Sequence, residues 1–211
     1  MTNNIKQTIQ EALTSRILVV DGAMGTSIQS LDLTADDFGG PDYEGCNEYL
    51  SLTNPNAISL IHEDYLKAGA DIIETNTFGA TSVVLAEYEL QHLTKELNLT
   101  SAKLAREMAD KYSTDQHPRY VAGSMGPTTK TISLTGGITF EELVESYKEQ
   151  AYGLLKGNVD FLLLETCQDT INIKAGIDGI NQAIEASGIS VPIAIQGTIE
   201  PMGTLLAGQD I

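Results

Sequence analysis

The stretch that decides the fold is Ile17-Leu18-Val19-Val20-Asp21-Gly22-Ala23-Met24-Gly25-Thr26. Its first four residues are all apolar and cannot alternate between core and solvent, which favours a strand covered on both faces, as in parallel α/β sheets. The run ends at Asp21, and Gly22 and Gly25 follow, which lack a Cβ and let the backbone turn tightly beside a ligand. Ligands of parallel α/β proteins bind outside the carboxyl ends of the strands. The stretch therefore predicts a strand that ends in a binding site, with a tight strand-to-helix turn capped by Asp21 as the alternative.

The same pattern of an apolar strand with a polar end recurs along the chain. Further strands are predicted at 70–78, 120–122, 160–164 and 191–195, with helical stretches between them. Five alternations of strand and helix indicate a parallel α/β architecture with right-handed crossovers, in one domain spanning residues 1–211. A closed barrel of this kind needs eight strands in about 250 residues. The chain is therefore expected to be either a small open doubly wound sheet or the first part of a barrel.

Local signals mark the helix boundaries. Asn54 and Pro55 are a polar cap followed by proline, which predicts a helix start, and Gly69 predicts its end. Thr139 and Glu142 have the spacing of a capping box, which predicts another start. Apolar periodicity predicts further helices at 4–13, 80–88, 91–112 and 173–184. The polar connection at 31–53 has no such period and is predicted to be a lid or a binding loop.

Composition argues against several classes of function. Of the 211 residues, 42% are hydrophobic and 19% charged, which is typical of a folded globular domain. The net charge of −17 argues against nucleic acid or a membrane as the partner and favours a small molecule. No stretch has the ~18 apolar residues of a membrane span, and the N-terminal residues lack a signal-peptide apolar region, so a cytoplasmic location is expected.

Three carboxylates, those of Asp21, Glu74 and Glu165, stand at the ends of predicted strands. Parallel strands end at one rim, so these side chains are expected to converge, where their charges repel one another unless a cation lies between them. An ammonium group of a small substrate or a divalent metal would satisfy this rim. The alternative, that each carboxylate caps a nearby helix, fits Glu74 alone better than all three.

Other chemistry is disfavoured. A phosphatase would need a second aspartate where Ala23 stands, and no glycine-rich nucleotide motif follows the first strand. His62, His92 and His117 are expected to be packing or surface residues.

Five motifs, in order along the chain, resemble the homocysteine S-methyltransferase family. They are Asp-Gly-Ala-Met-Gly-Thr at 21–26, Gly-Cys-Asn at 45–47, Gly-Ala-Asp-Ile-Ile-Glu-Thr-Asn-Thr-Phe at 69–78, Gly-Ser-Met-Gly-Pro at 123–127 and Leu-Leu-Leu-Glu-Thr at 162–166. The resemblance covers essentially the whole chain and is greatest to the cobalamin-dependent branch of the family. It implies a (β/α)8 TIM barrel of which this chain is a C-terminally truncated part with about five of the eight strands, expected to be inactive alone.

The resemblance also implies which residues bind the substrate. Asp21 and Glu165 match the acids that hold the ammonium group of homocysteine. The turn that receives the substrate carboxylate through its backbone N–H groups is matched by Gly22, Ala23, Met24 and Gly25.

Three further residues match positions of the barrel mouth in this family. They are Glu74, Asn76 and Ser124. The resemblance implies that they support the site without touching the substrate.

In this family zinc, held by three cysteine thiolates, binds the homocysteine sulfur. The metal removes the thiol proton, whose ordinary pKa of ~8.5 would otherwise leave little thiolate at neutral pH. The family's cysteines follow the sixth and eighth strands, which are expected to lie beyond Ile211, the last residue of this sequence. No catalytic residue and no metal ligand is therefore expected here, and Cys46 and Cys167 receive no role.

The implied reaction is methyl transfer to homocysteine, which gives methionine. In the cobalamin-dependent branch the donor is methylcobalamin, recharged from methyltetrahydrofolate on other modules of the same protein. Betaine or S-methylmethionine as donor stays open, as does a stand-alone amino-acid-binding module with an open five-stranded sheet. Unpaired strand edges attract other strands, so self-association through 17–20 or 191–195 is also expected.

Overall fold

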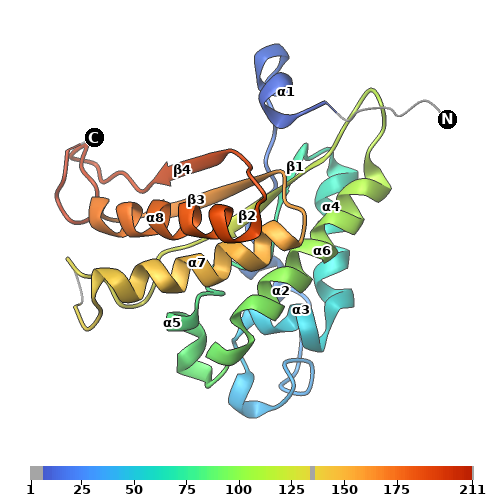
Figure 1. Ribbon diagram of the computed structural model, residues 1–211. Helices are drawn as coiled ribbons and strands as arrows, with labels where there is room; N and C mark the ends of the chain where they lie inside the picture. Colours follow the sequence, from blue (N-terminus) through green and yellow to red (C-terminus); the bar gives the residue numbers. More distant parts are fainter. Residues whose placement is uncertain (1–6, 134–135, 211) are drawn as a thin grey trace.

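The computed structural model of the chain describes residues 7–133 and 136–210. Its sheet consists of four parallel strands in the order β1 (Ile72–Glu74), β2 (Tyr120–Met125), β3 (Phe161–Cys167) and β4 (Ile193–Gly197). The predicted parallel α/β class is confirmed (Figure 1). Each strand is added on the same side of the one before it, without the reversal of order that defines a doubly wound sheet. The described sheet therefore winds in one direction, as barrel sheets do.

The first predicted strand, at 17–20, is not a strand of this sheet. Val20 makes only an isolated parallel bridge to Ile72, and the Asp21 N–H donates to the Ile72 carbonyl at 2.9 Å. The side chains of Ile17 and Val19 are 88% and 56% exposed, so the described part of the chain does not cover both faces of this run as expected. The described sheet has four strands where five were predicted, because this run follows β1 over too short a length to form a ladder.

The helices confirm most of the predicted boundaries. They are α1 (Ile9–Ser15), α2 (Met24–Gln29), α3 (Leu50–Thr53), α4 (Pro55–Ala68), α5 (Ser82–Leu85), α6 (Thr94–Tyr112), α7 (Phe140–Lys156) and α8 (Thr170–Ser187). Asn54 caps α4, Gly69 ends it with φ +110°, and Thr139 and Glu142 form the predicted capping box of α7. The helix predicted at 80–88 is divided into α5 and the 3-10 turn Ala86–Tyr88. Positions 4–6 of the helix predicted at 4–13 lie outside the described residues.

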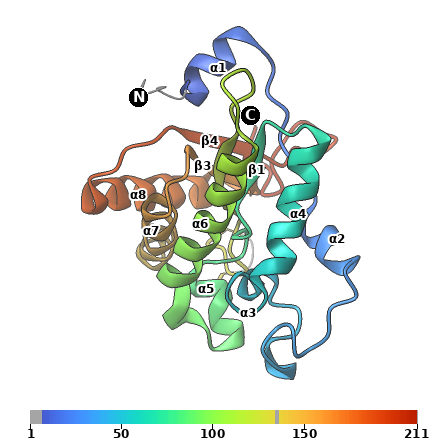
Figure 2. The same cartoon turned by 90° about the vertical axis from the view of Figure 1, so that its right-hand side faces the viewer.

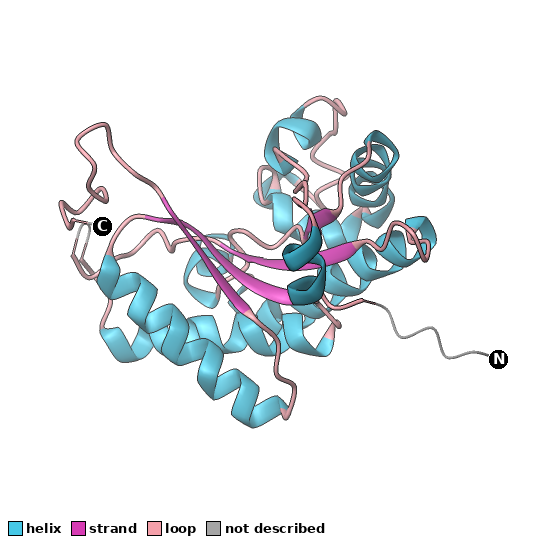
Figure 3. Ribbon diagram, turned by 90° about the horizontal axis from the view of Figure 1, so that it is seen from above, coloured by secondary structure: helices cyan, strands magenta, loops and turns pink. Residues whose placement is uncertain are grey.

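The two faces of the sheet are covered differently. Val121, Leu162 and Leu164 face the main hydrophobic core, which the long helices α6, α7 and α8 complete. Figure 3 shows the long helices along one face of the sheet. The other face carries Tyr120 and Phe161, which pack with α1. In Figure 2, α1 lies apart from the layer of long helices, over one end of the sheet. Neither the long helices nor α1 covers the polar carboxyl ends of the strands.

The 31–53 connection, predicted to be a lid or a binding loop, is packed against the body of the protein. It contains the 3-10 turns Pro41–Tyr43 and Asn47–Tyr49 and the short α3. Its Phe38, Cys46 and Leu50 side chains are buried. Two hydrogen bonds of 2.8 Å fasten it to the segment after β1, from Asn76 Nδ2 to the Asn47 carbonyl and from the Gly79 N–H to Glu48 Oε1. The connection is therefore a fixed wall beside the strand ends.

Candidate functional site

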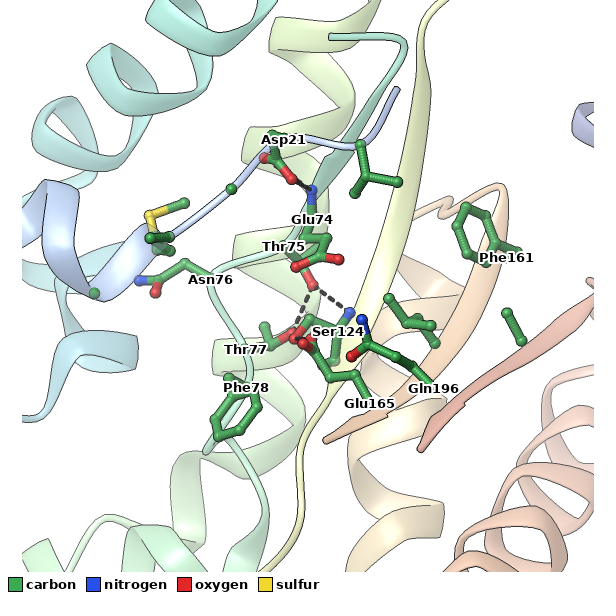
Figure 4. A pocket seen from close by; sticks show the side chains of 17 residues that line it. Asp21, Glu74, Thr75, Asn76, Thr77, Phe78, Ser124, Phe161, Glu165 and Gln196 are labelled. Carbon is green, nitrogen blue, oxygen red and sulfur yellow. Dashed lines mark hydrogen bonds between the residues drawn. The ribbon is translucent and has the colours of Figure 1, made fainter. Parts of the chain in front are cut away.

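A cavity of about 570 Å³ lies at the carboxyl ends of the strands (Figure 4). One side is formed by the backbone of 21–25 and the 74–78 segment, and another by Ser124, Glu165 and Gln196. Phe161 and Leu163 contribute an apolar surface. Among the described residues that line this cavity, none is Lys, Arg or His, while three are acids. The structure thus brings Asp21, Glu74 and Glu165 together, as the sequence predicted.

Asp21 is held by the backbone of β1. Both of its carboxylate oxygens lie 3.1 Å from the Glu74 N, which donates to them. Burial, followed by the charges of Glu74 and Glu165, raises the pKa of Asp21 to about 8, against a smaller opposing effect of the hydrogen bonds. Asp21 therefore retains a proton at neutral pH for as long as no cation is present.

The two glutamates are also held in a desolvated setting. Glu74 ends β1, and burial together with the charge of Glu165 raises its pKa to about 7. Burial also raises the pKa of Glu165, which the hydrogen bond donated by the Ser124 hydroxyl partly offsets. Three acids with raised pKa values in one cavity are suited to binding a cation, which would compensate their charges.

A bulge in β3 determines which side chains follow Glu165 into the cavity. Leu164 pairs with Ile195 and Cys167 with Gly197, so β3 has one residue more than β4 over this interval. The extra residue is accommodated at Thr166, whose φ of +54° lies in the left-handed region that few non-glycine residues adopt. Strict alternation would turn Cys167 inward with Glu165, but the bulge turns it into the helix-covered core.

The glycine turn differs in detail from its prediction. Neither Gly22 nor Gly25 has a positive φ, so the turn does not need glycine for its conformation. At Gly22 a Cβ would lie 3.4 Å from the Tyr65 hydroxyl, which is ordinary van der Waals contact, so lack of space does not demand glycine there either. α2 begins at Met24, and the N–H groups of its first turn have no acceptor within the helix. They therefore stay available to an anion beside the cavity.

The expected supporting residues differ in what they do. Ser124 donates to Glu165, and Asn76 donates to Asn47 O and Ser51 Oγ, so it fastens the 31–53 wall. All three residues line the cavity, and Glu74 places a carboxyl group there. Sequence reasoning did not single out Gln196, Thr75, Thr77 or Phe78, although the polar end of the fifth predicted strand was a signal for Gln196.

The thiols of this chain do not fit the zinc that the family resemblance implies. Cys46 and Cys167 are buried in different hydrophobic clusters. Burial raises the pKa of Cys46 to about 12 and that of Cys167 to about 11, which keeps both thiols neutral, whereas zinc binds thiolate. In the described part of the chain, no three His, Cys, Asp or Glu side chains are grouped as metal ligands.

The position of the family's zinc cysteines beyond Ile211 stays a prediction. Ile211 is the last residue of the sequence and itself lies outside the described residues, which end at Asp210. The structure therefore shows only that Cys46 and Cys167 are unsuited to zinc.

The histidines lie outside the cavity. His62 is fully buried in α4, and burial lowers its pKa to about 4. His117 Nε2 lies 2.7 Å from Asp71, in an ion-pair cluster with Arg16.

Among the described helices, none is long and apolar enough to cross a membrane.

Fold and site together define a parallel α/β protein with an acidic cavity at the carboxyl ends of its strands. Residues 18–211 match the model of the homocysteine S-methyltransferase family, and the chain belongs to that family. The family resemblance seen in the sequence motifs is thereby confirmed.

Individual relatives agree with this assignment. Methionine synthase of Mycobacterium leprae is 42% identical over 201 residues, which are 95% of this chain and 16% of that protein. The metallated form of the Escherichia coli homocysteine methyltransferase MmuM superposes with a TM-score of 0.75 at 23% identity, over 94% of this chain and 69% of that one. Its oxidised form gives a TM-score of 0.73 at 24% identity, over 94% and 68%. These structures share the fold of this chain.

Proposed function

We propose that the cavity binds homocysteine and that the chain is the homocysteine-binding part of a methionine synthase. The observation that carries the proposal is the convergence of Asp21, Glu74 and Glu165 on one cavity without a basic lining residue among those described. Membership of the homocysteine S-methyltransferase family and the 42% identity to a methionine synthase support it.

In this proposal Asp21 and Glu165 hold the substrate ammonium group. Its carboxylate accepts hydrogen bonds from the backbone N–H groups of the turn formed by Gly22, Ala23, Met24 and Gly25. Ser124 keeps Glu165 in place through its hydroxyl, and Asn76 keeps the 31–53 wall against the mouth. The chain's own residues thus fix the α-carbon of the amino acid and leave its thiol end free for the methyl donor.

The cofactors belong to other parts of such a protein. Zinc, when bound, supplies the thiolate form of homocysteine, but the thiols of this chain do not fit it. The chain spans 16% of the length of the methionine synthase it matches, and we assign zinc, cobalamin and methyltetrahydrofolate to the remainder of a protein of that kind.

A binding measurement tests the proposal. L-homocysteine is titrated calorimetrically into the wild-type chain, Asp21→Asn and Glu165→Gln, with the exposed acid Glu185 changed to Gln as the control. Removing one partner of a buried charge pair costs about 3 to 5 kcal/mol, so both cavity variants should bind far more weakly than the control. Normal binding by both would mean that these acids serve another purpose.

One assay separates this proposal from two alternative functions. One alternative differs in the methyl donor, and the other involves no methyl transfer. Betaine or S-methylmethionine would replace methylcobalamin in related enzymes, and a stand-alone amino-acid-binding module would transfer no methyl group. The protein that carries this chain is incubated with homocysteine and each donor in turn, and methionine is measured. Methionine from methylcobalamin alone supports the proposal, and methionine from no donor favours the binding module.

A further inference from the structure

Most polar side chains of the cavity are already bonded to the protein. The hydroxyl of Thr77 donates to the Ser124 carbonyl, and the Thr75 hydroxyl accepts from the Ser124 N–H. Asn76 uses its amide group on the 31–53 wall, and Ser124 donates its hydroxyl hydrogen to Glu165. These groups shape the cavity and have little bonding capacity left for a ligand.

The three acids differ in the hydrogen bonds that their carboxyl groups accept from the protein. Asp21 accepts the Glu74 N–H, and Glu165 accepts the Ser124 hydroxyl. The carboxyl of Glu74, by contrast, has no hydrogen-bond donor within the described part of the chain, although it lines the cavity. Figure 4 shows it in the space between Asp21 and Glu165. The carboxyl that lacks a protein partner is therefore the one in the middle.

We infer that Glu74 touches the substrate ammonium group as a third carboxylate, and that the ammonium displaces a proton which the three acids share in the free site. This inference rests on the proposed function and revises the expectation that Glu74 only supports the site. An ammonium group has three N–H donors, and the three carboxyls offer one acceptor each. The displaced proton passes to the buffer, so the bound complex carries the ammonium charge in its place.

Among the described residues that surround the cavity, no further charged side chain faces the three acids. On the cavity side, β2 contributes Ser124 and β4 contributes Gln196, neither of which is charged. Beyond the lining, Tyr65 of α4 lies behind Gly22, and Glu48 is bonded to the Gly79 N–H. Cys167 and Asp169 follow Glu165 on β3 and toward α8, and burial keeps the Cys167 thiol neutral.

The free cavity retains protons because its three acids are buried close to one another. The pKa of Asp21 is raised to about 8 and that of Glu74 to about 7, in each case first by burial and then by a neighbouring carboxylate. Because the groups are coupled, the protons belong to the cluster and to no single acid. At pH 7 the free cavity thus holds protons that a cation competes with.

Calorimetry with two ligands tests the inference. The wild-type chain and Glu74→Gln are titrated at pH 7 with L-homocysteine and with 4-mercaptobutanoate, which has the same thiol and carboxylate but no ammonium group. Each titration is run in phosphate and in Tris, whose different ionisation enthalpies report the protons released. Wild type should release roughly one proton per bound homocysteine. Glu74→Gln should bind homocysteine roughly 10- to 100-fold more weakly, which is the usual contribution of a hydrogen bond to a charged group, and should release fewer protons.

The remaining outcomes overturn the inference in distinct ways. If wild type binds homocysteine without releasing protons in excess of those released with 4-mercaptobutanoate, no shared proton is displaced. If Glu74→Gln keeps the wild-type affinity, Glu74 does not touch the ammonium group. If Glu74→Gln lowers the affinity for both ligands by the same factor, Glu74 shapes the cavity and does not recognise the ammonium group. Failure of the wild type to bind homocysteine at all would instead refute the proposed function. The wild-type proton count needs no variant and stands even if Glu74→Gln does not fold.

Discussion

At the scale of single residues, the buried carboxyl of Asp21 makes the stability of the chain depend on pH. The pKa of Asp21 is raised from 3.8 to about 8 by burial and by the neighbouring Glu74 and Glu165 charges. The folded chain thus binds a proton that the unfolded chain releases at much lower pH. This contribution to stability is complete below about pH 4 and is lost as the pH rises through 8.

The first prediction concerns this titration. Asp21→Asn removes the charge that the folded chain disfavours, so the ligand-free variant should lose less thermal stability than wild type between about pH 5 and pH 8.5. The advantage of the variant at the upper end should be on the order of 1 to 3 kcal/mol, because the coupled Glu74 still titrates. Melting temperatures across this range check it. Parallel curves for the two proteins would contradict a raised pKa at Asp21.

At the scale of elements, the β3 bulge allows Glu165 and Cys167 to face opposite sides of the sheet. Glu165 faces the cavity, while Cys167 is buried among the core residues of the helix layer. Thr166 accommodates the extra residue with φ +54°, and its N–H donates to Gln196 Oε1 at 3.4 Å. A non-glycine residue in this region stores strain, typically about 1 kcal/mol or more.

The second prediction is that Thr166→Gly stabilises the chain. Glycine adopts positive φ without steric cost, and the gain should be about 0.5 to 1 kcal/mol in urea unfolding. Cys167 should stay unreactive toward a thiol reagent, because the bulge is retained. Destabilisation, or a newly reactive Cys167, would show that the threonine side chain itself holds the bulge.

The packing of α8 on α7 depends on a glycine. A Cβ at Gly179 would lie 2.6 Å from the Val144 carbonyl oxygen and 2.8 Å from the Lys148 N, both of them backbone atoms of α7. Backbone atoms cannot rotate away as a flexible side chain can. The close approach of these helices therefore requires a residue without a Cβ at this point.

The third prediction follows for Gly179→Ala. The two helices must separate, and overpacking of this kind costs about 1 to 3 kcal/mol, more than the gain in helix propensity. Asn181→Ala, at an exposed position of the same helix, is the matched control and should be neutral or slightly stabilising. Equal unfolding midpoints for both variants would refute the tight contact.

At the scale of the whole molecule, the two sides of the sheet are left with exposed apolar residues. Ile193 and Ile195 on β4 are 36% and 49% exposed, and Val20 at the opposite side is 43% exposed. Within the described chain, β4 pairs with β3 on one side and with no strand on the other. Unpaired strand edges of this kind recruit other strands.

The fourth prediction is that the isolated chain self-associates through β4. Ile195→Lys places a charge on this edge and should shift the chain toward the monomer in light scattering. Met202→Lys changes an equally apolar and more exposed residue away from the sheet, and it should leave the association unchanged. A wild-type monomer whose β4 amides are strongly protected from hydrogen exchange would sink this prediction.

The parallel α/β class, the helix caps at Asn54 and Thr139 and the meeting of Asp21, Glu74 and Glu165 could all be derived from the sequence. Caps depend on residues three or four positions apart, and the ends of parallel strands must share one rim, so both are encoded locally or by strand direction alone.

Only the tertiary structure decided the remaining features, because they depend on contacts between distant segments. The apolar run at 17–20 predicts a buried strand, but no described segment covers its exposed side chains. The bulge at Thr166 exists only in the register of β3 against β4. The 31–53 connection becomes a wall through bonds to Asn76 and Gly79. Whether a polar side chain of the cavity, such as the Glu74 carboxyl, is left without a protein partner depends on what its neighbours from other strands have already bound.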